Sequence, residues 1–72
     1  MIRIAPDLVV APSLVERATG LVLEHAATGL AISTLREELD TSRKFAVPLA
    51  EWLDRQGVTV RRGDLRFPRA EP

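Results

Sequence analysis

The sequence contains no cysteine and only one histidine, His25. Without cysteine the chain has no disulfide bonds and no thiolate ligands, and a single histidine is too few for a zinc site. A lack of disulfides is typical of intracellular proteins. We therefore expect a cytoplasmic protein that holds no metal ion and no other cofactor.

Long apolar runs are also missing, since no stretch approaches the ~20 residues that a membrane-spanning helix needs. The chain has no glycine-rich phosphate loop, no nucleophile with a histidine partner and no evident carboxylate pair. We expect neither a membrane partner nor an enzyme. Its 72 residues suit one small domain with a small core.

The formal net charge is zero, yet the charges are unevenly distributed. Residues 1–40 hold three basic and six acidic residues, whereas residues 41–72 hold seven basic and four acidic ones. The two parts therefore carry −3 and +3. A positive surface patch, which is typical of nucleic-acid-binding proteins, could be hidden in this total.

The first ten residues are expected to be extended, with one short strand near Leu8–Val10. Apolar residues at helical spacing then predict a first helix that runs to about Ala27. Pro12 suits a first-turn position, whereas Ser13 begins an S-x-x-E capping box, and the two signals leave the start open by a residue. Gly29 is available as a left-handed cap.

A second, short helix begins near Ile32 or slightly later, if a capping box at Thr34 opens it. It ends by Asp40. A third helix begins almost at once, at Ser42 or the residue before it, and ends at Gly57. A short helix, a tight turn and another helix form the helix-turn-helix signature.

The buried face of the third helix is expected to hold Phe45, Leu49, Trp52 and Leu53. On this spacing both aromatic residues belong to the core rather than to a platform for stacked bases. Pro48 lies about two turns into the helix, where proline normally costs about 3 kcal/mol. It either makes a tolerated kink or sets the angle of the first turn.

After Gly57 the apolar period changes to two, and "VTVRRGDLRF" predicts a β-hairpin with a two-residue type II′ turn at residues 63–64. This turn pairs Val60 with Phe67 and Arg61 with Arg66. With the apolar pair facing the helices, the two arginines are expected to lie opposite each other on the outer face. Arg66→Glu would then stabilise the free hairpin by replacing a like-charge pair with an ion pair.

Three helices followed by a two-stranded hairpin predict a mixed α/β chain of the α+β type, namely a winged helix. The third helix is its recognition helix and the hairpin is its wing. We expect one domain over residues 1–72, with an ordered core at 3–67 and a frayed tail at 68–72.

Two cationic features are unfavourable for the free domain. Arg43 and Lys44 lie in the first turn of the third helix, where each positive charge costs about 0.3–1 kcal/mol. Arg61 and Arg66 oppose each other in the hairpin. A bound anion would relieve both, because a helix start offers free N–H groups and the cations add charge. The alternative is that these are ordinary solvated surface charges.

The stretch "TSRKFAVPLAEWLDRQGVTVRRGDLR", residues 41–66, closely resembles the last winged-helix domain of the bacterial selenocysteine-specific elongation factors, the SelB family. The family pattern reads T-S-R-K-Y-A-x-P-L-L-E-x-x-D-x-x-G-x-T-x-R-x-G-D-x-R. The upstream "RIAPDLVVAP" is similar to the entry of that domain, so the resemblance covers about residues 3–67. It implies an RNA-binding domain that grips the mRNA hairpin directing selenocysteine insertion. The GTPase part of the factor is absent from this chain.

The resemblance also implies site residues, which come from two places. The helix start would supply Ser42, Arg43 and Lys44. The wing would supply Arg61, Gly63, Asp64 and Arg66. Arg62, at a position that the family pattern leaves open, would add a charge to this RNA-binding site. The further partners implied are the remainder of the elongation factor and the ribosome.

Three residues depart from the family pattern. Phe45 replaces a frequent tyrosine, Val60 stands where a basic residue is common, and Ala31 takes the usual position of a threonine cap. These departures put the base preference and the start of the second helix in doubt.

Two other functions remain open. A winged helix that binds protein would expose apolar residues on the third helix, where only Val47 and Ala50 qualify. A reader of duplex DNA would place that helix in a major groove. We expect a monomer, because no long exposed apolar stripe remains.

Overall fold

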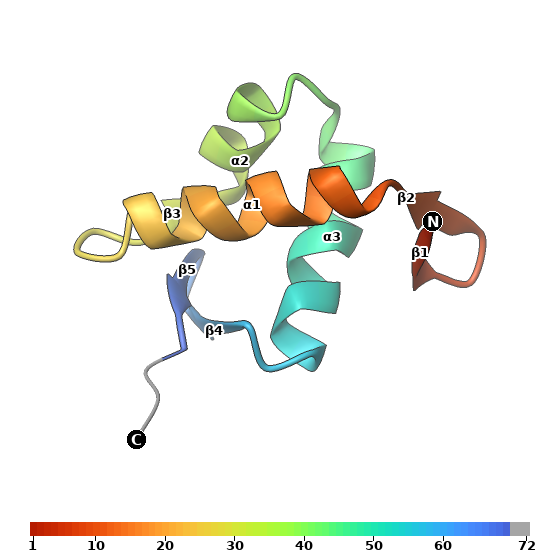
Figure 1. The fold of residues 1–72 in the computed structure, drawn as a ribbon. Helices are drawn as coiled ribbons and strands as arrows, with labels where there is room; N and C mark the ends of the chain where they lie inside the picture. Colours follow the sequence, from red (N-terminus) through yellow and green to blue (C-terminus); the bar gives the residue numbers. More distant parts are fainter. Residues whose placement is uncertain (70–72) are drawn as a thin grey trace.

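The computed structural model describes residues 1–69, which form three helices and five short strands (Figure 1). In chain order the elements are β1 (Ile2–Ala5), β2 (Leu8–Val10), α1 (Pro12–Glu24), β3 (Leu30–Ala31), α2 (Ile32–Glu38), α3 (Arg43–Arg55), β4 (Thr59–Arg62) and β5 (Leu65–Pro68). Three helices with antiparallel strands make a small α+β domain, which is consistent with the predicted winged helix.

The helices and strands enclose one small core. α2 packs on α3, α1 packs on β5, and α3 contacts both β1 and β4. In Figure 1 the β1–β2 hairpin lies beside the start of α1, and the other three strands lie toward its far end. The buried apolar residues are Ile4, Val10, Ala18, Val22, Leu30, Leu35, Leu39, Ala46, Leu49, Ala50 and Leu53.

Both predicted capping boxes are wrong. The residue that precedes α1 is Ala11, and the residue that precedes α2 is Ala31; neither can cap with its side chain. Each follows or belongs to a strand and has extended dihedral angles, with ψ of 145° and 154°. Strand pairing therefore fixes where the chain enters each helix. Pro12 takes the first helical position of α1, as one of the two start signals indicated.

The end of α1 also differs from the prediction, because the helix stops at Glu24 rather than near Ala27. The next residues form turns, and the Gly29 N–H donates to the His25 carbonyl at 2.7 Å. The chain has to reverse here so that Leu30 can pair with Arg66 in β5. This tertiary pairing overrides the helix propensity of the two alanines.

Schellman motifs close the other two helices. Asp40 follows α2 with φ of 53°, and the Thr41 N–H donates to the Arg36 carbonyl at 3.0 Å. Gly57 follows α3 with φ of 77°, and the Val58 N–H donates to the Leu53 carbonyl at 3.0 Å. The predicted helix end at Gly57 is confirmed. Asp40 ends α2 in the same way, in the tight turn of the helix-turn-helix.

The strands form two separate antiparallel sheets. β1 pairs with β2, which extends the single predicted strand into a hairpin. β5 is the central strand of the second sheet, with β3 on one side and β4 on the other. Pro68 pairs with Thr59, and the Arg69 N–H donates to the Val58 carbonyl, so the pairing continues beyond the predicted core limit. Residues 70–72 of the predicted tail lie outside the described residues.

Gly29 lies close to β5 at the exit of α1. Its φ is +86°, and a Cβ atom placed on it would lie 2.7 Å from Phe67 Cζ and 2.9 Å from Leu65 Cβ. A side chain here would therefore clash with the central strand as well as strain the backbone. Gly20, inside α1, has no such neighbour within 4 Å.

We expect Gly29→Ala to lower the free energy of unfolding by about 2–4 kcal/mol, through left-handed strain and overpacking against β5. Gly20→Ala is the matched control and should raise it by about 0.5–1 kcal/mol, because alanine is the better helix former. Thermal or urea melts of the two variants would measure both effects. If the two variants melted alike, the close packing of β5 would not require glycine at position 29.

Candidate functional site

The start of α3 is cationic and has no acidic residue in its first turn. Ser42 is the residue that precedes the helix, and its side chain makes no capping hydrogen bond. Arg43 and Lys44 are both exposed. The first N–H groups of a helix lack intrahelical partners, so this end combines free donors with two positive charges. This arrangement suits an anion, as the sequence predicted.

The hairpin of β4 and β5, which we call the wing, has the predicted register. Arg61 pairs with Arg66 and Val60 with Phe67, around a two-residue turn. Gly63 has φ of +62° whereas Asp64 does not have a positive φ, which matches the predicted type II′ turn. Arg61 Nε donates to the Gly63 carbonyl at 2.8 Å, which folds the side chain over the turn.

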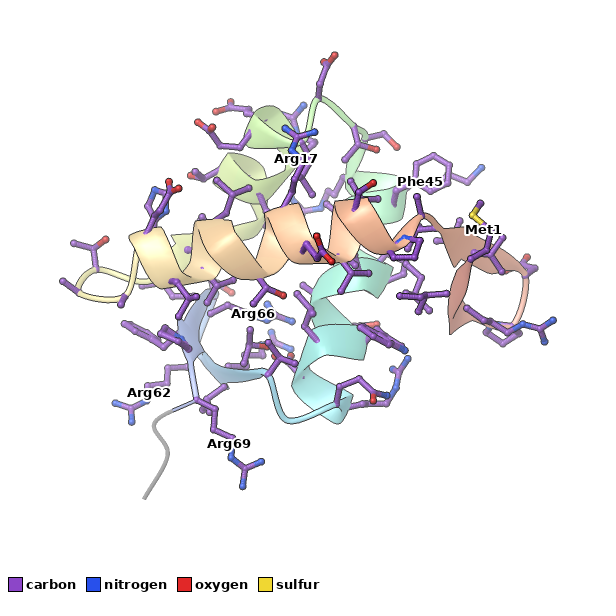
Figure 2. The ribbon with its side chains drawn as sticks, in the orientation of Figure 1. Met1, Arg17, Phe45, Arg62, Arg66 and Arg69 are labelled. Atoms are coloured by element: carbon purple, nitrogen blue, oxygen red, sulfur yellow. The ribbon has the colours of Figure 1, made fainter. Side chains whose placement is uncertain are left out.

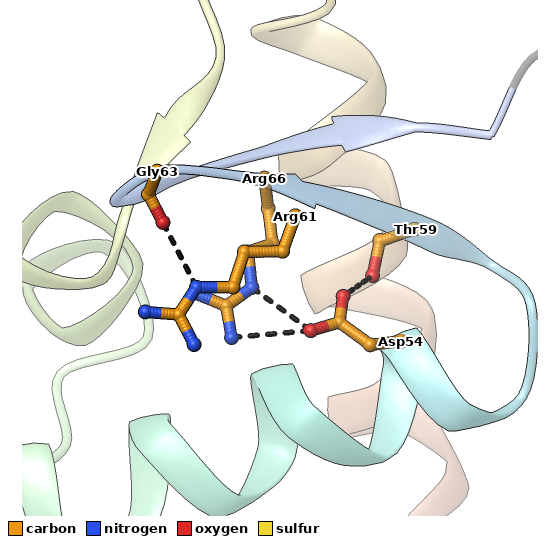
Figure 3. A network of polar contacts seen from close by, with 5 residues as sticks. All are labelled: Asp54, Thr59, Arg61, Gly63 and Arg66. Atoms are coloured by element: carbon orange, nitrogen blue, oxygen red, sulfur yellow. Dashed lines mark hydrogen bonds and ion pairs between the residues drawn. The ribbon is translucent and has the colours of Figure 1, made fainter.

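The predicted faces of the wing are wrong. Arg66 is buried, with 5% of its surface exposed, whereas Val60 is 37% exposed. The guanidinium of Arg66 faces α3 and donates to Asp54 Oδ2 from Nε at 3.2 Å and from Nη2 at 3.1 Å (Figure 3). Asp54 Oδ1 accepts a further hydrogen bond from the Thr59 hydroxyl. Asp54, Thr59 and Arg66 therefore form one network, which we call the clamp.

The reason for this reversal is that pairing with β3 brings one face of β5 against the exit of α1. Leu65 and Phe67 turn toward Gly29, near the exit of α1, and are half-buried there. Successive side chains of a strand point to opposite faces, so Arg66 has to point to the other side, which is covered by α3. Arg66→Glu is therefore expected to destabilise the free domain rather than stabilise its hairpin, because a second carboxylate would lie beside Asp54.

A cleft of about 350 Å³ lies between the wing, α3 and the start of α2. Its lining residues are Ala31, Ile32, Ser33, Arg43, Val47, Glu51, Arg61, Asp64 and Arg66. Four of the eight predicted site residues thus meet in one place: Arg43, Arg61, Asp64 and Arg66. The cleft has three arginines, two carboxylates and an apolar wall, so it offers donors, acceptors and a nonpolar surface together.

The other four predicted residues do not line this cleft. Ser42 and Gly63 lie next to it in the chain and are exposed. Arg62 extends from the other face of the wing, where its Cζ lies 5.7 Å from the centre of the Phe67 ring (Figure 2). Lys44 lines a second cleft of about 410 Å³ instead.

That second cleft lies between the β1–β2 hairpin and α3, and its walls include Leu8, Phe45 and Pro48. Phe45 is 41% exposed, so its predicted place in the core is wrong. Ala46 and Ala50 are buried in the α3 stripe instead, and Trp52 packs against the core as predicted. Pro48 has no N–H for the Lys44 carbonyl, which removes one helical hydrogen bond beside this cleft.

Sequence reasoning missed Asp54, Thr59 and Glu51. Arg55, the basic residue next to Asp54 in the sequence, is not its partner and donates to the Ile4 carbonyl at 3.0 Å. One available signal was strand parity, because Thr59 and Arg66 have to share a face once the register is set. Another was helical spacing, since Asp54 follows Ala46 and Ala50 at intervals of four residues.

None of the helices in residues 1–69 is long and apolar enough to cross a membrane. In the same residues no group of three or more histidine or acidic side chains is arranged to hold a metal ion.

Arg66→Ala should lower the free energy of unfolding by about 3–5 kcal/mol, because it leaves the partly buried Asp54 carboxylate without its ion pair. Arg61→Ala changes the directly opposite residue, which is exposed, and should have an effect within about 0.5 kcal/mol. Urea melts of the pair would check this. A similar decrease in the free energy of unfolding of both variants would contradict the conclusion that only Arg66 is buried in an ion pair.

The chain also matches a protein-family model. The model described as "Elongation factor SelB, winged helix" matches residues 22–67, which is more than half of the chain and includes every candidate site residue. No curated protein matches the chain. The matched range contains the helix-turn-helix, the cleft lining and all of the wing except Pro68. On this match, the chain belongs to the winged-helix family of elongation factor SelB.

Proposed function

We propose that this domain binds an RNA hairpin with an unpaired loop, namely the selenocysteine-insertion element of an mRNA, during translation elongation. The observation that carries the proposal is the cleft in which Arg43 of the recognition helix and Arg61 of the wing meet. Membership of the SelB family supports the same function. The domain is a binding module in this proposal, and the catalytic part of the factor is elsewhere.

RNA is generally recognised by its phosphates and shape in the stem and by base edges where loop bases are unstacked. Arg43, Lys44, Arg61 and Arg62 are exposed and could each donate to a phosphate. Asp64 and Glu51 repel phosphates but accept hydrogen bonds from the N–H groups of a base. The cleft therefore suits the junction of a stem and its unpaired loop.

The wider assignments follow from the proposed function. The partners would be the mRNA hairpin, the remainder of the elongation factor and the ribosome. The place of action would be the cytoplasm, where translation occurs, and the domain would act as a monomer within its factor.

A second candidate function is protein binding. Phe45 is a large apolar side chain on the first turn of α3, and its 41% exposure is what a protein-binding winged helix would present. The alternative of duplex DNA binding also uses α3. Binding to an RNA hairpin and to duplex DNA at fixed salt separates the three functions, because a protein-binding module would bind neither.

The RNA hairpin should bind more tightly than duplex DNA, and log K should fall with log salt. If about four phosphates are contacted, the slope should be roughly −3 to −4. Fluorescence anisotropy over a salt series would measure it. A flat response would remove the phosphates from the interaction, and a preference for duplex DNA would replace the proposed function.

Arg43→Ala and Lys44→Ala should weaken RNA binding and leave the free domain as stable as before or more stable by about 0.3–1 kcal/mol each, because cations in a first turn oppose the helix dipole. Melts of the free variants, with anisotropy titrations alongside, would check both parts. A clear loss of stability would mean that these side chains support the fold.

A further inference from the structure

The recognition helix and the wing have to be held at a fixed angle if they are to bind one RNA together. Arg43 lies at the start of α3, whereas Arg61 lies in β4, on the far side of the turn at residues 56–58. Their separation depends on how the wing is tilted against α3. Local interactions within either element cannot set that tilt.

Asp54 is the residue that connects α3 to both strands of the wing. One carboxylate oxygen accepts from Thr59 in β4, and the other accepts from Nε and Nη2 of Arg66 in β5 (Figure 3). Asp54 lies in the last turn of α3, so a shift of either strand would break at least one of these bonds.

Arg66 is poorly placed to bind a phosphate itself. Its side chain is 7% exposed, and two of its three guanidinium nitrogens already face Asp54. In Figure 2 it lies within the molecule, whereas Arg62 extends away from it. Its backbone is fixed by pairing with Leu30 on one side and with Arg61 on the other.

The clamp also settles the like-charge contact between the paired arginines. Asp54 neutralises Arg66, which would otherwise repel Arg61 across the strand pair. Arg61 can then remain over the turn, where it is exposed and its Nε donates to the Gly63 carbonyl. Arg66 therefore holds the wing against α3, and the positive charge of Arg61 is available to a ligand.

We propose that Asp54, Thr59 and Arg66 are positioning residues for RNA binding: they fix the wing against the recognition helix, and Arg66 acts through the placement of Arg61 without touching the RNA. This inference rests on the proposed RNA-hairpin function. It assigns a role to two residues, Asp54 and Thr59, that are absent from the predicted site.

The test uses the salt dependence of binding to separate positioning from contact. Thr59→Val removes the clamp hydroxyl while keeping the shape of the side chain, and Thr59→Ser is the matched control that keeps the hydroxyl. We expect Thr59→Val to bind the RNA hairpin roughly three- to tenfold more weakly than Thr59→Ser at every salt concentration, with the same slope. Melts would ensure that each variant is folded at the assay temperature.

A direct phosphate ligand behaves differently. Arg61→Gln should make the salt slope shallower by about 0.7–0.9, because one counterion-releasing contact is lost. Arg66→Gln should weaken binding without changing the slope. If Arg66→Gln reduced the slope as Arg61→Gln does, Arg66 would be a contact residue and the inference would be wrong.

Two further outcomes separate the inference from the proposed function. If the parent domain bound RNA but Thr59→Val bound as tightly as Thr59→Ser, the clamp would have no part in positioning. If the parent domain did not bind RNA at all, the proposed function would fail and the RNA role of the clamp with it. Amide hydrogen exchange of the free domain tests the clamp without RNA. Thr59→Val should speed exchange in the wing, and unchanged exchange would show that the clamp does not fix the wing.

Discussion

The pairing of β5 with a strand on each side is the constraint on which the arrangement of this domain depends. β3 contributes only two residues, Leu30 and Ala31, yet it makes β5 the central strand of its sheet. Both faces of β5 are also covered, one by the exit of α1 and the other by α3. One face receives Leu65 and Phe67, and the other receives Arg66.

Burying an arginine on that second face costs desolvation free energy, which has to be offset by a partner of opposite charge. Asp54 provides this partner, and Thr59 satisfies the second carboxylate oxygen. An ion pair of this kind is worth less than an apolar pair for stability alone, but it accepts only one geometry. The domain therefore obtains a defined angle between helix and wing from an interaction that adds little to its net stability.

The sequence predicted the helix-turn-helix and the wing register because both depend on local chemistry: apolar spacing, Gly57, and a two-residue turn at 63–64 that permits one register. It failed where distant pairing decides. A two-residue strand such as β3 has no pattern of its own, and without it the inward face of the wing and the early end of α1 could not be derived. Helical spacing predicted that Phe45 would be buried in α3, but the smaller Ala46 is the buried residue.

The balance of charges in the cleft favours selective binding over general attraction to nucleic acid. Asp54 neutralises Arg66. The cleft lining also includes two carboxylates, Glu51 and Asp64, which equal in number its two remaining arginines, Arg43 and Arg61. Lys44 and Arg62 lie outside the cleft and are exposed, so these two positive charges are separate from its lining. In the proposed function, phosphates would meet these exposed cations, and the polar and apolar groups of the cleft would meet a base. A uniform duplex cannot use such a cleft, whereas an unstacked loop base flanked by its own phosphates can, which is why the charge arrangement supports a hairpin loop as the ligand.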